Sequence, residues 1–105
     1  MEEPNFTYLN SLTAGDKAFE EKILKIIITE FPEEKNLYLN NIILNKLDQA
    51  ANNVHKIKHK ISLLGLEQSY GLASQHELNL INDNSILHED FTEILNTINR
   101  FLKEL

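Results

Sequence analysis

The chain has 105 residues, of which 42% are hydrophobic, and its 16 acidic residues outnumber the 10 basic ones, giving a formal net charge of −6. This length and apolar fraction predict a single domain over residues 1–105. The lack of cysteine excludes disulfides and thiolate metal sites. The acidic balance argues against a nucleic-acid binder, and no apolar run approaches the roughly 20 residues that cross a bilayer. We expect a cytoplasmic monomer that binds neither nucleic acid nor a membrane.

Helical periodicity runs along the chain, and no alternating strand pattern competes with it. Residues 1–14 predict a short turn or helix that covers one end of the fold. Gly15 and Asp16 then break the chain, and Asp16 offers a cap for a helix that reaches Phe31. Apolar residues cover more than half of that helix's circumference. Either the helix is buried on two sides or it exposes an apolar strip to a partner, and both uses can coexist.

A second helix is predicted to begin at Pro32, because proline suits a first helical turn and two glutamates follow it at the positive end of the dipole. It should reach about Leu47. Asp48 is predicted to cap the next helix, which carries the apolar stripe Val54, Ile57, Ile61 and Leu64 and ends around Gly65.

Two further helices complete the prediction. One runs from about Glu67 to Leu80, and a polar turn at 82–85 leads to Ser85 as the cap of the last helix. In that helix an apolar residue recurs every third or fourth position, at Leu87, Phe91, Ile94, Ile98, Phe101 and Leu105. Because the connections are short, we expect an all-α, antiparallel up-and-down four-helix bundle with a short extra N-terminal helix.

The stretch 54–66 places one histidine on the polar side of its helix. At about 100° per residue, His55, Lys58, His59 and Ser62 share a face centred roughly 140° from the apolar stripe. An exposed imidazole beside cations suits a site that attracts an anion, and phosphate is the leading candidate. Lys56, Lys58 and Lys60 crowd around the histidines, and such a patch can focus an anion on an acidic protein. The alternative is an ordinary solvated helix face.

The run His-x-Ile-Lys at 55–58, followed by Gly65, resembles the active helix of histidine-containing phosphotransfer domains. The likeness covers nearly the whole chain. It includes the early Leu12, Gly15 and Asp16, the Phe-Pro-Glu-Glu junction at 31–34 and the number of helices. The chain departs from the family at His59, where the family usually has glycine.

The resemblance implies that His55 accepts a phosphoryl group from a receiver-domain aspartate and passes it to another receiver, while Lys58 steadies the phosphoryl group. The implied partners are receiver domains of a hybrid histidine kinase or a response regulator. Those domains bring their own Mg²⁺, so the chain needs no cofactor. A neutral imidazole can attack phosphorus without a separate base. No glycine-rich phosphate loop is present, so we expect a phosphocarrier and not an enzyme with a nucleotide site.

Other interpretations stay open. The chain can be a phosphorylation-independent helical module that binds receiver or kinase domains. His55 and His59 have the i, i+4 spacing of metal ligands, although two ligands do not make a site. His59, Lys56 and Ser62 are secondary or docking candidates, and Lys56 points about 100° away from His55. His76 is expected to be a partly buried packing residue, and His88 to lie in the first turn of the last helix.

Overall fold

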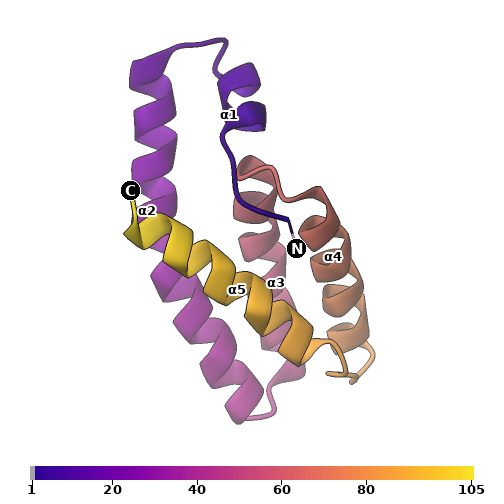
Figure 1. Ribbon diagram of the computed structural model, residues 1–105. Coiled ribbons are helices and arrows are strands. Elements are labelled where there is room, and N and C mark those ends of the chain that lie inside the picture. Colours follow the sequence, from indigo (N-terminus) through magenta and orange to yellow (C-terminus); the bar gives the residue numbers. More distant parts are fainter. Residues whose placement is uncertain (1) are drawn as a thin grey trace.

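The computed structural model describes residues 2–105, and its regular structure is entirely helical. The helices are α1 (Thr7–Leu12), α2 (Lys17–Ile43), α3 (Leu47–Leu63), α4 (Glu67–Ile81) and α5 (His88–Lys103) (Figure 1). The described residues contain no strand, which confirms the all-α class. Within the same residues, none of the helices combines the length and the apolar character that crossing a membrane requires.

Helix α3 has a central place in the fold. It packs against α2 on one side and α4 on the other, while α5 packs against both α4 and α2. Figure 1 shows α5 crossing diagonally over α2 and α3, with α1 at the end of the molecule where the α3–α4 turn lies. A short helix thus precedes the four longer ones.

The predicted helix start at Pro32 is wrong. Helix α2 continues through Pro32 for 27 residues, from Lys17 to Ile43. A proline inside a helix removes one backbone hydrogen bond and costs about 3 kcal/mol. Ile27, Phe31 and Tyr38 lie on one side of the continuous helix and are all buried, and burying each large apolar side chain contributes about 1.5–3 kcal/mol. Core packing on both sides of Pro32 thus outweighs the local preference for a break.

The predicted helix caps have mixed outcomes. Asp16 caps α2 as predicted, because its Oδ1 accepts a hydrogen bond of 3.1 Å from the Phe19 backbone N–H. Asp48 is not a cap. Helix α3 begins one residue earlier, and Asp48 lies in its first turn, where a carboxylate still interacts favourably with the helix dipole.

The predicted cap at Ser85 is also wrong. Helix α5 begins at His88, and the Ser85 backbone carbonyl, not its side chain, accepts a hydrogen bond of 3.0 Å from the His88 N–H. The turn after α4 reaches α5 through a left-handed residue, Asp83. The position of His88 in the first turn of the last helix is confirmed.

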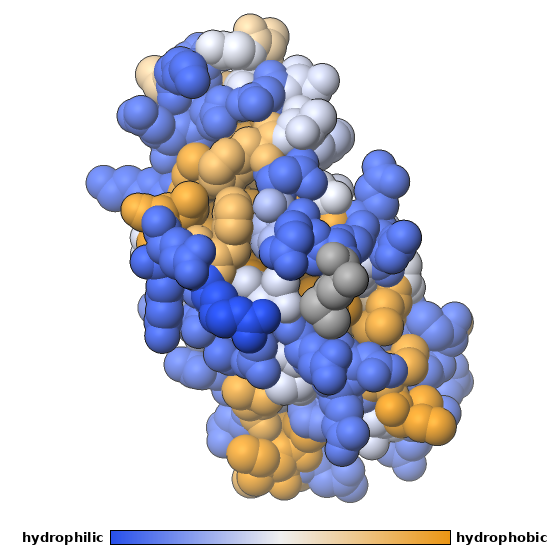
Figure 2. Space-filling view, in the orientation of Figure 1, coloured by the Kyte–Doolittle hydropathy of each residue, from blue (hydrophilic) through white to orange (hydrophobic). Residues whose placement is uncertain are grey.

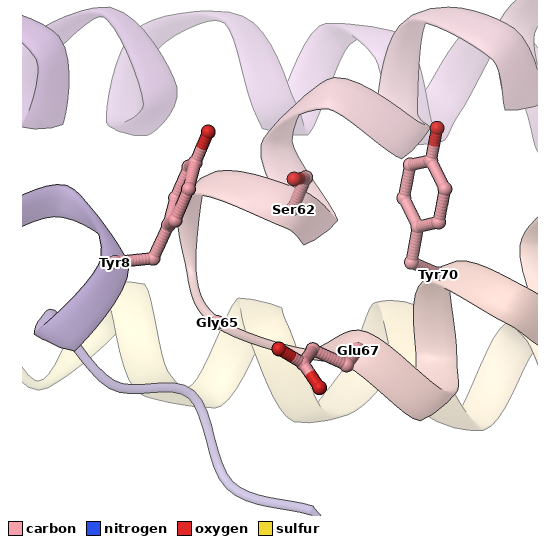
Figure 3. A pocket seen from close by; sticks show the side chains of 5 residues that line it. All are labelled: Tyr8, Ser62, Gly65, Glu67 and Tyr70. Atoms are coloured by element: carbon pink, nitrogen blue, oxygen red, sulfur yellow. The ribbon is translucent and has the colours of Figure 1, made fainter. Parts of the chain in front are cut away.

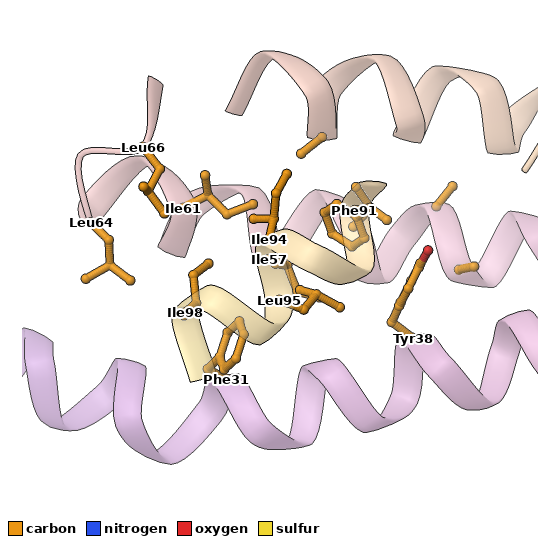
Figure 4. Close-up of a cluster of buried hydrophobic side chains, with 14 of the residues drawn as sticks. Phe31, Tyr38, Ile57, Ile61, Leu64, Leu66, Phe91, Ile94, Leu95 and Ile98 are labelled. Carbon is orange, nitrogen blue, oxygen red and sulfur yellow. The ribbon is translucent and has the colours of Figure 1, made fainter. Parts of the chain in front are cut away.

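The hydrophobic core lies where α2, α3, α4 and α5 meet (Figure 4). The apolar stripe predicted for α3 is fully buried. Of the six residues predicted for the stripe of the last helix, Phe91, Ile94 and Ile98 are buried, Leu87 and Phe101 are partly buried, and Leu105 is exposed. The largest fully buried side chains are Tyr38, Phe31, Phe91, Leu9, Ile27, Ile57, Ile61, Leu64, Leu66, Leu80, Leu95 and Ile98.

Helix α2 is more apolar than its buried face requires. Phe19, Ile26 and Ile28 are 48%, 52% and 42% exposed, whereas Ile27 and Phe31 are buried. The helix therefore both contributes to the core and exposes apolar side chains. Figure 2 shows that apolar residues form several separate patches on the face in view, divided by hydrophilic side chains.

A polar network lies inside the core, and it corrects the expectation for His76. This side chain is fully buried, and its Nε2 lies 2.7 Å from the Tyr38 hydroxyl, which is also 2.7 Å from His88 Nδ1. The hydroxyl has one proton, so it donates to one ring and accepts from the other. His76 Nδ1 is buried without a partner in the described structure. Because a buried lone pair is tolerated better than a buried N–H, we assign the proton of His76 to Nε2.

Candidate functional site

Helix α3 presents His55 to solvent, as predicted. Its neighbours Val54 and Ile57 are fully buried, so they fix the rotation of the helix. The His55 side chain is 56% exposed. The exposed face of α3 that carries His55, Lys58, His59 and Ser62 is thus confirmed as a shared face, with Lys58 and Ser62 partly buried at its edge.

Glu77 of α4 connects the two central residues of this face. Its Oε2 lies 3.2 Å from His55 Nδ1, and its Oε1 lies 2.9 Å from Lys58 Nζ. An ionised carboxylate only accepts hydrogen bonds, so the contact places the imidazole proton on Nδ1. The other ring nitrogen, Nε2, then keeps its lone pair. One carboxylate therefore selects the tautomer of His55 and holds an ammonium one helical turn away.

Lys58 has a second contact that fixes its position. Its Nζ lies 5.4 Å from the centre of the Tyr70 ring, on α4, a distance at which a cation is attracted by an aromatic face. The Lys58 side chain is only 14% exposed. Tyr70 and Glu77 together hold this lysine much more firmly than a solvated surface lysine.

Some of the residues predicted as secondary or docking candidates lie next to His55, and others lie elsewhere on the surface. The His59 ring meets the His55 ring edge to face, with 5.3 Å between the ring centres. Ser62 lines a cavity at the end of α3. Lys56 is exposed and lines a different cavity, which also includes Glu33 and Asn53, so it does not join His55.

Lys60 does not belong to the predicted lysine patch. It is 8% exposed, and its Nζ lies 3.0 Å from Glu30 Oε1 and 3.1 Å from both carboxylate oxygens of Glu34. By helical rotation Lys60 lies about 140° from His55, next to the buried stripe. Since a buried charge must be paired, the two carboxylates of α2 give this lysine a structural role.

Sequence reasoning missed Glu77. The residue stands 22 positions after His55, and no periodicity within α4 distinguishes it from other surface glutamates. Its position next to buried His76 places it at the edge of the apolar stripe of α4. A carboxylate at such an edge, on the helix that follows the histidine helix, is the one local indication that the sequence contains.

The arrangement does not resemble a metal centre. Within residues 2–105, no three or more histidine, cysteine, aspartate or glutamate side chains are placed to hold a metal ion together.

Comparison with known proteins gives no match to a family model, to a curated protein or to a solved structure. The likeness to phosphotransfer domains therefore depends on the residues of this chain alone.

Proposed function

We propose that this chain is a phosphocarrier of a two-component phosphorelay, which accepts a phosphoryl group on His55 Nε2 from a receiver-domain aspartate and passes it to another receiver. One observation carries the proposal: a single carboxylate, Glu77, contacts both His55 Nδ1 and Lys58 Nζ at 3.2 and 2.9 Å. This arrangement gives an exposed imidazole the correct tautomer to act as a nucleophile and places a cation beside it.

The transfer step balances without a cofactor on this chain. The lone pair of His55 Nε2 attacks the phosphorus of an aspartyl phosphate, the new N–P bond forms, and the P–O bond to the aspartate breaks. The aspartate leaves as a carboxylate. The imidazole gains positive charge during attack, and Glu77 at Nδ1 stabilises that charge. The receiver supplies the Mg²⁺ that neutralises its own phosphate.

Lys58 provides the fixed cation for the incoming group. In the structure its ammonium is paired with Glu77 and lies against the Tyr70 ring. The three equatorial oxygens of the transferring phosphoryl group need charge neutralisation, and an ammonium held one turn from the histidine supplies it without moving far. The phosphoryl group then competes with Glu77 for Lys58.

We also propose that the helices form an antiparallel up-and-down four-helix bundle. The ring of contacts from α2 to α3, α3 to α4, α4 to α5 and α5 to α2 is what an antiparallel up-and-down four-helix bundle requires, with α1 as the extra helix. In this interpretation the chain works as a cytoplasmic monomer, and the exposed face of α3 is where receiver domains dock.

The test is phosphoryl transfer from several aspartyl-phosphorylated receivers, measured as an acid-labile and base-stable label. The wild type should be labelled and His55→Gln should not. The small phosphoryl donor phosphoramidate, followed by phosphorus NMR, tests the same nitrogen without a partner. If neither donor labels the wild type at His55, the carrier function is wrong and a phosphorylation-independent binding module replaces it.

Two further variants separate the roles within the site. Glu77→Gln keeps the shape of the side chain but removes its charge. Labelling of His55 should then slow by about ten- to a hundredfold, which is the rate change that corresponds to losing one hydrogen bond to a charged group. His59→Gly restores the residue that the family usually has and should retain transfer. Complete loss of transfer in His59→Gly would show that this histidine is not peripheral.

A further inference from the structure

A second candidate site lies at the end of α3 beyond Ser62. It is a cavity of about 220 Å³, lined by Tyr8, Ser62, Gly65, Glu67 and Tyr70. Figure 3 shows Tyr8 and Tyr70 standing on either side of Ser62, with both phenol hydroxyls pointing the same way and the Glu67 side chain on the opposite side of Ser62 from these hydroxyls. The lining residues come from α1, the end of α3, the α3–α4 turn and the start of α4, so the cavity forms only in the folded chain.

Neighbouring contacts hold the walls of the cavity in place. The segment that leads into α1 is fixed to the α3–α4 turn by a 2.9 Å hydrogen bond from Asn5 N–H to the Leu64 carbonyl. Gly65 has a φ of +75°, and a Cβ on it would lie 2.6 Å from the Asn5 side chain. The turn therefore needs glycine both for its backbone conformation and for close packing against the segment that positions Tyr8.

The charge at the start of α4 determines what the cavity can bind. A helix N-terminus usually attracts an anion, but Glu2 already accepts hydrogen bonds of 2.9 and 2.8 Å from the Gln68 and Ser69 N–H groups. Burial raises the pKa of Glu2, but these backbone hydrogen bonds outweigh it and hold the pKa below its ordinary value. Among the residues that line the cavity the charged one is Glu67, whose carboxylate repels anions, and the nearby Lys58 ammonium is already paired with Glu77.

The polar groups of the cavity are free to meet a ligand. The hydroxyls of Tyr8, Ser62 and Tyr70 and the carboxylate of Glu67 make no hydrogen bond or ion pair within residues 2–105. The Tyr70 ring already attracts one ammonium, that of Lys58, at 5.4 Å from its centre. Two aromatic rings, a carboxylate and a hydroxyl around one small cavity are the groups that recognise organic cations.

We propose that the cavity between Tyr8 and Tyr70 binds an organic cation, a quaternary ammonium or guanidinium group, whose charge is balanced by Glu67. The cation has two sources: a free small molecule, or an arginine side chain of a protein that docks on α3. Ser62 follows His55 by seven residues, which places the cavity roughly 10 Å along the same face of the helix. A cation bound there lies at the edge of the surface that carries the histidine.

The test is an NMR titration of the full chain with choline and with its neutral isostere 3,3-dimethylbutan-1-ol, which has the same shape without the charge. Choline should shift the ring signals of Tyr8 and Tyr70 saturably, and the neutral alcohol should bind about tenfold more weakly. Ethylguanidinium is titrated in parallel. Tighter binding of choline indicates a free quaternary ammonium ligand, and tighter binding of ethylguanidinium indicates a partner's arginine.

Matched variants test the assignment of each group. Tyr70→Leu should weaken choline binding about tenfold, whereas Tyr70→Phe keeps the aromatic face and should bind within about twofold of the wild type. Glu67→Gln should weaken binding, while Glu104→Gln, the same change of charge on an exposed residue at the far end of the chain, should not. Helical content by circular dichroism confirms that each variant is folded. Equal binding of choline and the neutral alcohol, or no saturable shift with any cation, would overturn the proposal. Neither outcome bears on labelling of His55.

Discussion

Acidification should destabilise the fold through His76. This imidazole is fully buried and bonded to the Tyr38 hydroxyl. Burial, with a smaller contribution from the charge of His88, lowers the pKa of His76 from 6.5 to about 4. The folded protein thus keeps His76 neutral at a pH where the unfolded chain has already bound a proton. Because the unfolded state binds more protons in this range, stability rises with pH.

The expected magnitude follows from the two pKa values. A tenfold change in a protonation equilibrium is worth about 1.4 kcal/mol, so the change from 6.5 to about 4 corresponds to about 3 kcal/mol of folding free energy. This contribution is complete above pH 6.5, falls as the pH drops below that value, and is lost once the pH passes below 4. For a domain of this size, 3 kcal/mol is a large fraction of the total stability.

The assay is urea unfolding followed by circular dichroism at several pH values between 7.5 and 4. His76→Gln removes the titrating group. The loss of unfolding free energy between pH 7 and pH 4 should therefore be about 3 kcal/mol smaller in this variant than in the wild type. His59→Gln removes an exposed imidazole and should follow the wild-type curve. A ring NMR titration should find His76 still neutral at pH 5. Parallel pH profiles for the wild type and His76→Gln would refute the reasoning.

Five other substitutions test how the fold is held, each by urea unfolding. Gly65→Ala and Gly15→Ala each force a side chain into a left-handed backbone conformation, which costs about 1 kcal/mol. Only Gly65→Ala also displaces a packed side chain, so it should lower the free energy of unfolding more than Gly15→Ala does. Equal losses in the two variants would contradict this reasoning. Lys60→Met leaves a buried carboxylate without its cation and should lower the free energy of unfolding by about 3 kcal/mol. Lys56→Met, on the exposed surface, should change this free energy by no more than about 0.5 kcal/mol. Similar losses in the two variants would refute a structural role for Lys60. Pro32→Ala restores a helical N–H and should stabilise the protein by about 1–2 kcal/mol. A loss of stability in this variant would instead mean that the proline is needed in α2.

Periodicity predicted the parts of this fold that depend on one helix at a time. The buried stripe of α3 and the regular stripe of α5 were both predicted, and so was the exposure of His55. In each case the spacing of apolar residues within one helix determines which side faces the core. Asp16 was predicted as a cap for the same reason, because capping involves only neighbouring residues.

Features that depend on contacts between helices were not predicted. Pro32 looked like a helix start because the local preference is clear, but burial of Phe31 and Tyr38 on either side of it decides the outcome. Lys60 looked like part of a surface patch because its two carboxylate partners are on α2. His76 looked like a packing residue because its partner, the Tyr38 hydroxyl, is 38 positions away in the chain.

The contrast between His55 and His59 shows what such a contact adds to the site. Both imidazoles are exposed on the same face of α3, four residues apart, and their rings touch. His55 has a carboxylate at Nδ1, whereas the His59 side chain makes no hydrogen bond within the described residues. Both side chains are exposed on one helix face, and the contact with Glu77 is what distinguishes His55. It follows that the ratio of phosphoramidate labelling at the two histidines, measured in one molecule, reports the effect of that carboxylate. The ratio should favour His55 in the wild type and fall towards one in Glu77→Gln.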